Sequence, residues 1–305
     1  MSQRTTNRIG AYLYQIQHLP RTLLIALGYR IGRFRSRDIK KPSNWEQLTF
    51  SEKVSWRCRH PNPLINYSSW VDKGRVKEVV AQHFKTAESY QIVHSIDEID
   101  ANNLPATYVM KATHGWDMSL LVKSGTIQGG NRDLTHAEVV ADTDHLRSIA
   151  DAWFQSRRQM KRRLKERQYS FVKPGIIFEQ HIEPIDYELQ LFLFNGCYRF
   201  AMVFFRDFHH DGITHLLYDE QWQKLEPGSE KAIKRYAKQR SNIPPPPSSI
   251  LKSLVQLCHS VDQVRADFYV CGEDYYFSEF TFTHSGGSPG FIGRYDAELG
   301  RFWLP

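Results

Sequence analysis

Residues 264–290 read VRADFYVCGEDYYFSEFTFTHSGGSPG. Two runs rich in aromatic and β-branched residues flank a Gly-Glu-Asp triplet, which predicts two antiparallel strands joined by a tight turn. Side chains alternate between the faces of a strand, so Arg265 and Asp267 share one face of the first strand. Glu279 and Thr281 share a face of the second strand, and a hairpin can bring the two polar faces together.

The carboxylates of this hairpin predict a cation site. Asp267 and Glu279 stand among aromatic residues, where a buried and unpaired carboxylate is costly, and hard oxygen ligands of this kind suit Mg²⁺. Arg265 beside them would neutralise a phosphoryl group during its transfer. The alternative is an ordinary Arg265–Asp267 ion pair on the surface of a strand.

A glycine-rich loop, SGGSPGFIG at 285–293, follows the second carboxylate. Glycine lets backbone N–H groups approach an anion closely, so Ser285, Gly286 and Gly287 are candidates for a substrate loop. A plain surface turn explains the same composition equally well.

Two strands further upstream end in charged residues. In ATYVMKATHG (106–115), Lys111 closes an apolar run, and its ammonium group needs a nucleotide phosphate or a neighbouring carboxylate as partner. His114 and Gly115 begin a loop that could fold over phosphates. In IIFEQHIE, the strand ends at Glu179, which is either a contact for adenine or an ordinary strand end.

The remaining pattern predicts an α+β chain with mixed and antiparallel sheets. The stretch TFSEKVSW supplies a helix start, and the Asn-Gly of FNGCYRF predicts a tight hairpin. A run of basic residues at 157–167 is either a solvated helix face or a binding site. Helical patterns cover 49–84, 136–168 and 250–262. A short strand and a turn are expected at 90–100, a strand that runs into a glycine-containing loop at 106–115, and further strands at 175–182, 188–205 and 213–219.

The composition limits the class of protein. The 305 residues are 41% hydrophobic and 13% aromatic, which predicts one folded body of two or three lobes rather than a disordered chain. The net charge of +7 favours anionic partners such as nucleotides, acidic sugars or an anionic membrane surface, although an ordinary basic surface explains it equally well. Aromatic residues spaced along a basic groove are not evident, so we expect no nucleic acid partner.

The cysteine and histidine content gives no metal pattern. The four cysteines have no metal-ligand spacing and are expected to be reduced thiols. His209, His210 and His215 match no standard metal-binding spacing either. No Walker A loop is present, and nothing suggests a catalytic cysteine.

The N-terminal segment 1–42 mixes apolar residues with arginines and predicts two helices separated by Pro20. It is either an arm packed on the body or on a second chain, or an amphipathic segment that lies on anionic lipid. With no signal peptide and no apolar run long enough to span a bilayer, we expect a cytoplasmic protein, with peripheral association at the inner membrane face in the second case.

These features occur in an order that resembles the ATP-grasp superfamily. Asp72 and Lys73 stand near the start of a helix, Lys111 with its glycine loop follows, and R-x-D, E-x-T and a second glycine loop close the series. More closely, the chain resembles the TupA-like ATP-grasp family, which is associated with teichuronopeptide and surface polysaccharide biosynthesis. The matching motifs lie within residues 45–300 and read LTFSEKVSW, DKGRVKEVV, LPATYVMKATHG, FLFNG, YDEQW, RADFY and SEFTFTHSGG.

The resemblance implies an ATP-grasp fold with sheets that enclose a nucleotide cleft, and it implies a role for each matching residue. Lys111 would contact the α- and β-phosphates of ATP, and the loop from His114 to Ser119 would close over them. The adenine hinge would run from Glu179 to Ile182. The remaining nucleotide contacts would come from Lys73, His114, Gly115, Gln180, and Asp186 or Glu188 near the ribose.

The resemblance also implies the catalytic centre. Asp267 and Glu279 would hold Mg²⁺, and Arg265 would stabilise the transferring phosphoryl group. Thr281 stands where many ATP-grasp enzymes have an asparagine metal ligand. When the chain is aligned on FLFNG, Gln190 stands at a position where related sequences carry a lysine, so one positive charge near the phosphates is lost.

The activity that the resemblance implies is carboxylate–amine ligation through an acyl phosphate. The carboxylate would be an acidic glycan such as a uronic acid, or a small carboxylate, and an amino acid or amine would be joined to it. The alternatives are an ATP-dependent phosphotransferase acting on a glycan, and a non-catalytic basic protein that binds glycan or membrane. The expected segments are an arm (1–42), an N-terminal lobe (43–105), a lid with the adenine hinge (106–183) and a core with the metal site (184–305).

Overall fold

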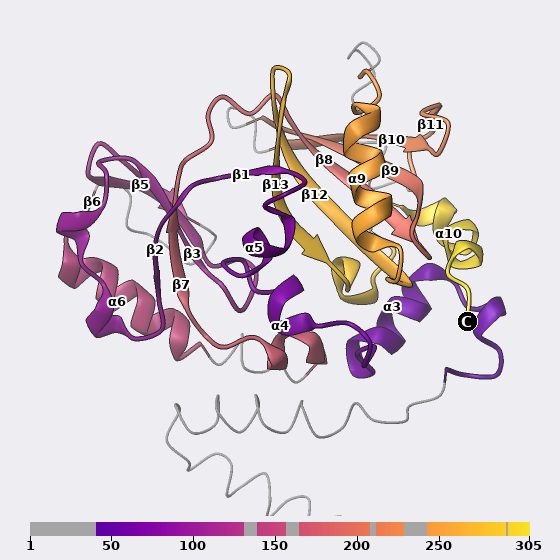
Figure 1. Ribbon diagram of the computed structural model, residues 1–305, viewed down its shortest axis with the longest axis horizontal. Coiled ribbons are helices and arrows are strands. Elements are labelled where there is room, and N and C mark those ends of the chain that lie inside the picture. Colours follow the sequence, from indigo (N-terminus) through magenta and orange to yellow (C-terminus); the bar gives the residue numbers. More distant parts are fainter. Residues whose placement is uncertain (1–40, 131–138, 157–164, 208–211, 229–242, 291) are drawn as a thin grey trace, which may run out of the picture.

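The computed structural model describes residues 41–130, 139–156, 165–207, 212–228, 243–290 and 292–305 (Figure 1). The predictions for residues 1–40 of the arm, for most of the basic run and for His209 and His210 lie outside the described residues. The described part is built around two sheets, and the expectation of an α+β fold with mixed and antiparallel sheets is confirmed.

The larger sheet has seven strands in the order β1-β13-β12-β8-β9-β10-β11. Only the β1–β13 pair is parallel, and every other pair in this sheet is antiparallel. Its strands are β1 (Lys85–Thr86), β8 (Tyr187–Phe194), β9 (Cys197–Asp207), β10 (Gly212–Asp219), β11 (Lys224–Leu225), β12 (Gln263–Cys271) and β13 (Asp274–Thr281).

The smaller sheet is antiparallel throughout and has six strands in the order β2-β7-β3-β4-β5-β6. It lies on the left in Figure 1, with the larger sheet on the right. Its strands are β2 (Ser89–Val93), β3 (Tyr108–Ala112), β4 (Ser119–Lys123), β5 (Thr126–Gly130), β6 (Val139–Val140) and β7 (Ile176–Glu179).

Both predicted hairpins of the larger sheet are present. Asn195 and Gly196 join β8 to β9 with φ angles of 48° and 74°, and this pair of left-handed residues matches the twist of the two strands. Gly272, with φ of 59°, begins the turn from β12 to β13. A bulge after Asp267 leaves Ser278 without a counterpart on β12, so the pairing changes from Asp267 with Glu279 to Phe268 with Phe277.

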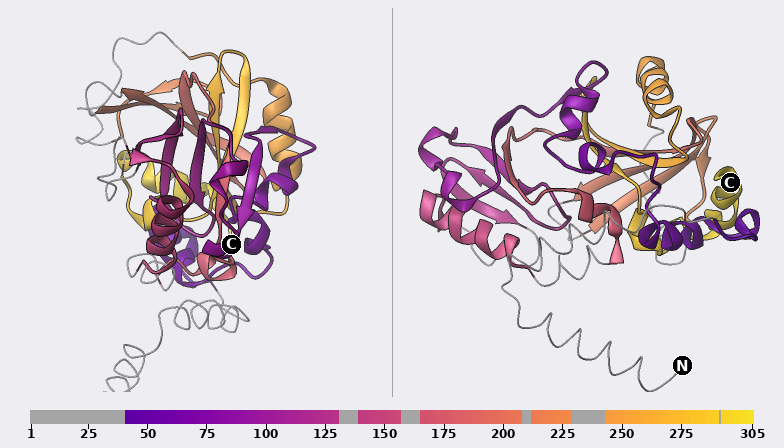
Figure 2. Two further views of the ribbon diagram at one scale, coloured as in Figure 1. Left: turned by 90° about the vertical axis from the view of Figure 1, so that its left-hand side faces the viewer. Right: turned by 60° about the horizontal axis from the view of Figure 1, so that its bottom comes forward.

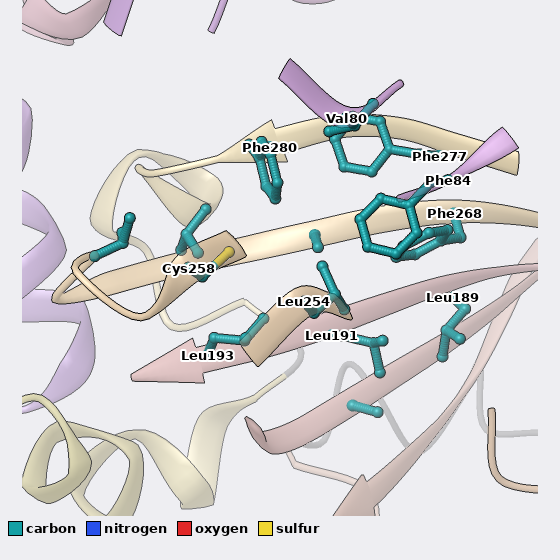
Figure 3. Close-up of a cluster of buried hydrophobic side chains, with 14 of the residues drawn as sticks. Val80, Phe84, Leu189, Leu191, Leu193, Leu254, Cys258, Phe268, Phe277 and Phe280 are labelled. Carbon is teal, nitrogen blue, oxygen red and sulfur yellow. The ribbon is translucent and has the colours of Figure 1, made fainter. Parts of the chain in front are cut away.

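One face of the larger sheet carries the main apolar core (Figure 3). The helix α9 (Ser248–Cys258) lays Leu254 and Cys258 on it, and the short helix α5 (Val76–Val80) adds Val80. Phe84 packs edge-on against Phe268 at 5.3 Å between ring centroids. This packing fixes which face of β12 is apolar, and Asp267 therefore faces the opposite side.

Helices α3 (Phe50–Arg59) and α10 (Asp296–Phe302) cover part of that opposite face, where they pack on apolar residues of β8, β9 and β10. The predicted helix start is confirmed, because Thr49 and Glu52 form a capping box at the N-terminus of α3. The continuous helical pattern expected over 49–84 is wrong, because the chain breaks at Pro61 and Pro63. It resumes only as two short helices, α4 (Tyr67–Trp70) and α5.

The smaller sheet is covered by α6 (Thr143–Phe154), whose buried residues include Leu146 and Trp153. This helix is shorter than the predicted helical region 136–168. The strand β6 lies in the first part of that region, and α6 begins only after its N-cap residue, Asp142. The helix expected at 250–262 is α9, which begins directly after Pro247 and ends at Cys258. No helix in the described ranges is both long and apolar enough to cross a membrane.

Candidate functional site

Arg265 and Asp267 form a buried ion pair on β12. The guanidinium donates from Nε to Asp267 Oδ1 at 2.7 Å and from Nη2 to Asp267 Oδ2 at 2.5 Å, a two-point contact within one strand. Both residues are only 8% exposed. The pair considered as the alternative in the sequence therefore exists, but it is buried and does not lie on the surface.

Two further groups contact the same guanidinium. Nη2 also donates to Thr281 Oγ1 at 3.1 Å on the paired strand β13, and Nη1 lies 2.6 Å from His284 Nδ1. Nothing in the sequence pattern singled out His284, which sits just before the glycine loop. The guanidinium is thus held on several sides before any substrate binds.

Glu279 lies directly opposite Asp267 in the β12–β13 ladder. Its side chain is 37% exposed, and its Oε2 accepts from Lys73 Nζ at 2.5 Å. Burial acts to raise the pKa of Glu279, but the charges of Lys73 and then Arg265 outweigh it and lower the pKa. Glu279 is consequently an ionised carboxylate at neutral pH, at the open side of the pair.

A second charged group lies on the smaller sheet. Lys111 Nζ of β3 is 2.5 Å from Glu179 Oε1 of β7, and Lys77 Nζ is 2.6 Å from the other oxygen of the same carboxylate. Burial acts to raise the pKa of Glu179, but the two lysines lower it. Lys111 therefore has the carboxylate partner that the sequence left as one of two alternatives.

The sequence interpretation missed Lys77. It lies one helical turn beyond Lys73 in DKGRVKEVV, a spacing that could have drawn attention to it. Besides Glu179, its ammonium group donates to the carbonyl of Ala87 at 2.6 Å. Lys77 thereby fixes the carboxylate that in turn positions Lys111.

The two charged groups are joined across the sheets. Lys111 Nζ lies 5.7 Å from the centroid of the Tyr269 ring on β12, and the backbone N–H of Lys73 donates to the carbonyl of Thr113 at 3.4 Å. Figures 1 and 2 show α5 between the smaller and the larger sheet. The segment that carries Lys73 and Lys77 therefore brings both charged groups into one region between the sheets.

The loop after β3 is closed at its base, where the N–H of Ala112 donates to the carbonyl of Met118 at 3.0 Å. His114 is buried, stacks on Phe154 at 5.9 Å and accepts at Nδ1 from the N–H of Gly175 at 3.3 Å. His114 therefore anchors the loop to α6 and β7.

The segment after β7 contains the other predicted nucleotide contacts. The backbone N–H of Gln180 donates to the carbonyl of Glu88 at 2.8 Å, and Ile182 is buried.

Asp186 and Glu188 contact β12 of the larger sheet. Asp186 Oδ2 accepts from the N–H of Gly272 at 2.7 Å, so this carboxylate stabilises the β12–β13 turn. Glu188 is paired with Tyr269, on the face of the larger sheet that carries Asp267.

Gln190 stands next to Asp267 in the β8–β12 ladder. Its Nε2 is 3.4 Å from Asp267 Oδ2, whereas its buried Oε1 has no hydrogen-bond partner among the described residues. A neutral amide thus occupies the place beside the carboxylate pair for which the family resemblance implies a lysine.

The glycine loop packs on α3. Ser285, Gly286 and Gly287 have φ angles of 51°, 61° and 85°, three left-handed residues in succession. A Cβ on Gly287 would lie 2.1 Å from Ser55 Oγ and 2.9 Å from its backbone nitrogen. The loop is therefore not a plain surface turn, and it carries His284 towards Arg265.

The carboxylate pair has features that fit a divalent cation. Burial raises the pKa of Asp267 to about 7 despite Arg265, and the neighbouring Glu279 adds to the rise. A cation between Asp267 and Glu279 would remove this repulsion. In the described ranges no group of three or more His, Cys, Asp or Glu residues is arranged to hold a metal, so substrate phosphates would have to complete the coordination, as is usual for Mg²⁺.

Comparison with known proteins gives a family match over most of the chain. The family model described as TupA-like ATPgrasp matches residues 52–304. No curated protein matches.

Solved structures that align with the chain have low sequence identity. D-alanine–D-alanine ligase from Bacillus anthracis, complexed with ATP, aligns with a TM-score of 0.45 at 12% identity, over 86% of this chain and 74% of that one. L-amino acid ligase from Bacillus licheniformis aligns with a TM-score of 0.46 at 12% identity, over 85% of this chain and 55% of that one.

Proposed function

The chain belongs to the TupA-like ATP-grasp family, and on that premise we propose that it is an ATP-dependent carboxylate–amine ligase that forms an amide through an acyl phosphate. The observation that carries the proposal is the buried Arg265–Asp267 pair with Glu279 opposite it. This arrangement places a fixed cationic group beside two carboxylates, which suits the stabilisation of a phosphoryl group in transfer.

The nucleotide would lie between the two sheets, with Mg²⁺ held by Asp267 and Glu279. When bound, the metal supplies neutralisation of phosphate charge and orients the phosphates. Lys111 and Lys73 are held by the carboxylates of Glu179 and Glu279, respectively, and would turn their ammonium groups towards phosphate oxygens. The hydroxyl of Thr281 accepts a hydrogen bond from Arg265, so Thr281 would also position the guanidinium.

The reaction would proceed in two displacements. An oxygen of the substrate carboxylate attacks the γ-phosphorus of ATP, the bond to the β-phosphate oxygen breaks, and ADP leaves. The nitrogen of the amine then attacks the acyl carbon, the carbon–oxygen bond to phosphate breaks, and the nitrogen loses a proton. Arg265 would face the phosphoryl group in both steps, because that group is first acquired by the carboxylate and then leaves it.

For the substrate we propose a carboxylate of a surface polysaccharide or of its precursor, such as a uronic acid, joined to an amino acid or another amine. The family association and the net charge of +7 support an acidic glycan. We further propose that the protein works in the cytoplasm, and that residues 1–42 hold it at the inner membrane face if the glycan is lipid-linked.

The test is ADP release with Mg²⁺, ATP, a uronic acid and an amino acid. We expect release to require both the carboxylate and the amine, and the Asp267→Asn and Glu279→Gln variants to lose about 100-fold in rate. Asp274→Asn is the matched control, because this exposed carboxylate lies on the same hairpin and pairs only with Lys85 among the contacts described for it.

Other outcomes would contradict the proposal in different ways. Full turnover by Asp267→Asn or Glu279→Gln would show that the carboxylate pair is not the catalytic centre. A stable phosphorylated product formed without an amine would identify a phosphotransferase. The absence of any ATP-dependent thermal shift would identify a binding protein without catalytic function.

A further inference from the structure

His284 is a buried group that contacts the Arg265 guanidinium and has no part in the proposed ligase reaction. It is 5% exposed and follows β13 on the way into the glycine loop. Its ring packs edge-on against Phe192 at 5.2 Å between centroids and lies 6.2 Å from Phe50. The imidazole is therefore fixed in orientation by aromatic neighbours from β8 and α3.

The hydrogen bond to Arg265 determines which tautomer is present. A guanidinium has only donors, so His284 Nδ1 must accept from Arg265 Nη1 across the 2.6 Å between them. The remaining hydrogen of the imidazole is then on Nε2, which faces Ser285 Oγ at 3.4 Å. Burial, and then the charge of Arg265, hold the pKa of His284 well below its ordinary value, so the ring stays neutral and remains an acceptor.

The contacts of the guanidinium leave little freedom. Asp267 accepts hydrogen bonds from Nε and from Nη2, and Thr281 accepts one from the other hydrogen of Nη2. His284 takes one hydrogen of Nη1. Among the contacts that the structure describes, the second hydrogen of Nη1 remains for a substrate oxygen.

We propose that His284 is a positioning residue for the ligase reaction: it holds Nη1 of Arg265 so that the free N–H of this nitrogen faces the transferring phosphoryl group. Asp267 and Thr281 hold Nε and Nη2, which leaves Nη1 without an anchor of its own. With His284 as a third anchor, Arg265 is pre-organised before ATP and the carboxylate arrive. The proposal rests on the ligase function proposed above.

The test compares three variants in the ADP-release assay. His284→Phe keeps an aromatic ring between Phe50 and Phe192 but removes the acceptor, and we expect kcat to fall about 10- to 100-fold with little change in the KM for ATP. His284→Asn places an acceptor oxygen near the position of Nδ1, and we expect kcat within about 3-fold of wild type. His259→Phe removes a hydrogen bond of an exposed histidine at the end of α9 and serves as the control.

Melting temperatures separate positioning from general loosening. A purely structural role predicts that kcat falls in proportion to the loss of stability and that His284→Asn, which leaves more empty volume, is the worse variant. The positioning role predicts the opposite order in kcat. The ¹⁵N shifts of the His284 ring give a second readout on the resting protein, with Nδ1 unprotonated and Nε2 protonated at neutral pH.

Each outcome is decisive. Wild-type kcat in His284→Phe, an equal loss in His284→Asn, or a protonated Nδ1 would overturn the positioning role while the ligase function stands. A wild-type protein that releases no ADP with carboxylate and amine would overturn the ligase function, and the positioning role with it. The expected pattern is a loss in His284→Phe, recovery in His284→Asn and an unaffected control.

Discussion

At the scale of single residues, the site is a set of charges that hold one another in place. Glu179 is buried and forms ion pairs with Lys77 and Lys111, and Glu279 forms an ion pair with Lys73. A buried carboxylate without a cationic partner would cost several kcal/mol. Each lysine therefore stabilises the resting protein, and the ammonium groups of Lys73 and Lys111 are the ones proposed to turn to a nucleotide.

Lys77 gives a prediction at this scale. Replacing Lys77 with Met leaves Glu179 with one lysine and removes the tie to the carbonyl of Ala87, so the Glu179–Lys111 pair loses its fixed orientation. We expect the KM for ATP to rise about 10-fold with a smaller effect on kcat, and stability to fall by about 1–3 kcal/mol. Steady-state kinetics and urea unfolding measure both effects.

Lys85→Met is the control for this prediction. Lys85 forms an ion pair with Asp274, but both side chains are largely exposed, and exposed pairs contribute little. An unchanged KM for ATP in Lys77→Met would mean that Glu179 and Lys111 lie outside the nucleotide site.

At the scale of elements, the glycine loop depends on α3. Three left-handed residues let the chain turn sharply after β13, and Gly287 then touches the backbone of Ser55. The contact is too close for any side chain at this position. Through this contact α3, which also packs Phe50 against His284, becomes part of the wall of the proposed catalytic centre.

The Gly287→Ala variant tests this dependence. The added Cβ would lie 2.1 Å from Ser55 Oγ and 2.9 Å from its nitrogen, so the loop must move away from α3. We expect a loss of more than about 2 kcal/mol in stability, measured by chemical unfolding, together with a fall in kcat.

Gly272→Ala separates the two causes of this loss. Gly272 also has a positive φ, of 59°, but a Cβ there would meet nothing within 4 Å. The Gly272→Ala variant therefore loses stability only through backbone strain, by about 1 kcal/mol. Equal destabilisation by the two variants would show that the contact with Ser55 has no energetic effect.

At the scale of the whole molecule, each sheet has its own apolar core, and the segment that carries Lys73 and Lys77 contacts both sheets. Lys73 and Lys111 face the same region from different elements, and the Tyr269 ring lies close to Lys111. A nucleotide bound there would link the two sheets. The division into the four segments 1–42, 43–105, 106–183 and 184–305 stays a prediction.

This link predicts that nucleotide stabilises the protein as a unit. With Mg²⁺ and a non-hydrolysable ATP analogue at about 100 times its Kd, the free energy of unfolding should rise by about 2.7 kcal/mol. Lys111→Met should lose most of this rise, as followed by thermal unfolding. Lys123→Met, on the same sheet and paired with Glu183 at 3.0 Å on the surface, should keep it. Equal stabilisation of both variants would exclude Lys111 as a phosphate contact.

The sequence by itself determined the features that depend on neighbouring residues. Alternation along a strand put Arg265 and Asp267 on one face, the Asn195–Gly196 pair predicted the β8–β9 turn, and Thr49 began α3. Each of these follows from backbone geometry within a few residues. The order of the motifs gave the resemblance to a known family, and that resemblance added the ATP-grasp fold.

Only the tertiary structure decided which charges meet. Three contacts show this: Lys77 with Glu179, Lys73 with Glu279, and Arg265 with His284. The residues of each pair are far apart along the chain or are separated by a turn, so no periodic pattern in the sequence connects them. Such contacts depend on how the sheets and α5 pack, and the packing is set by apolar burial over the whole core. For that reason the sequence predicted that Asp267 and Glu279 could share a cation, but it did not reveal the lysine that holds Glu179 or the histidine that holds the arginine.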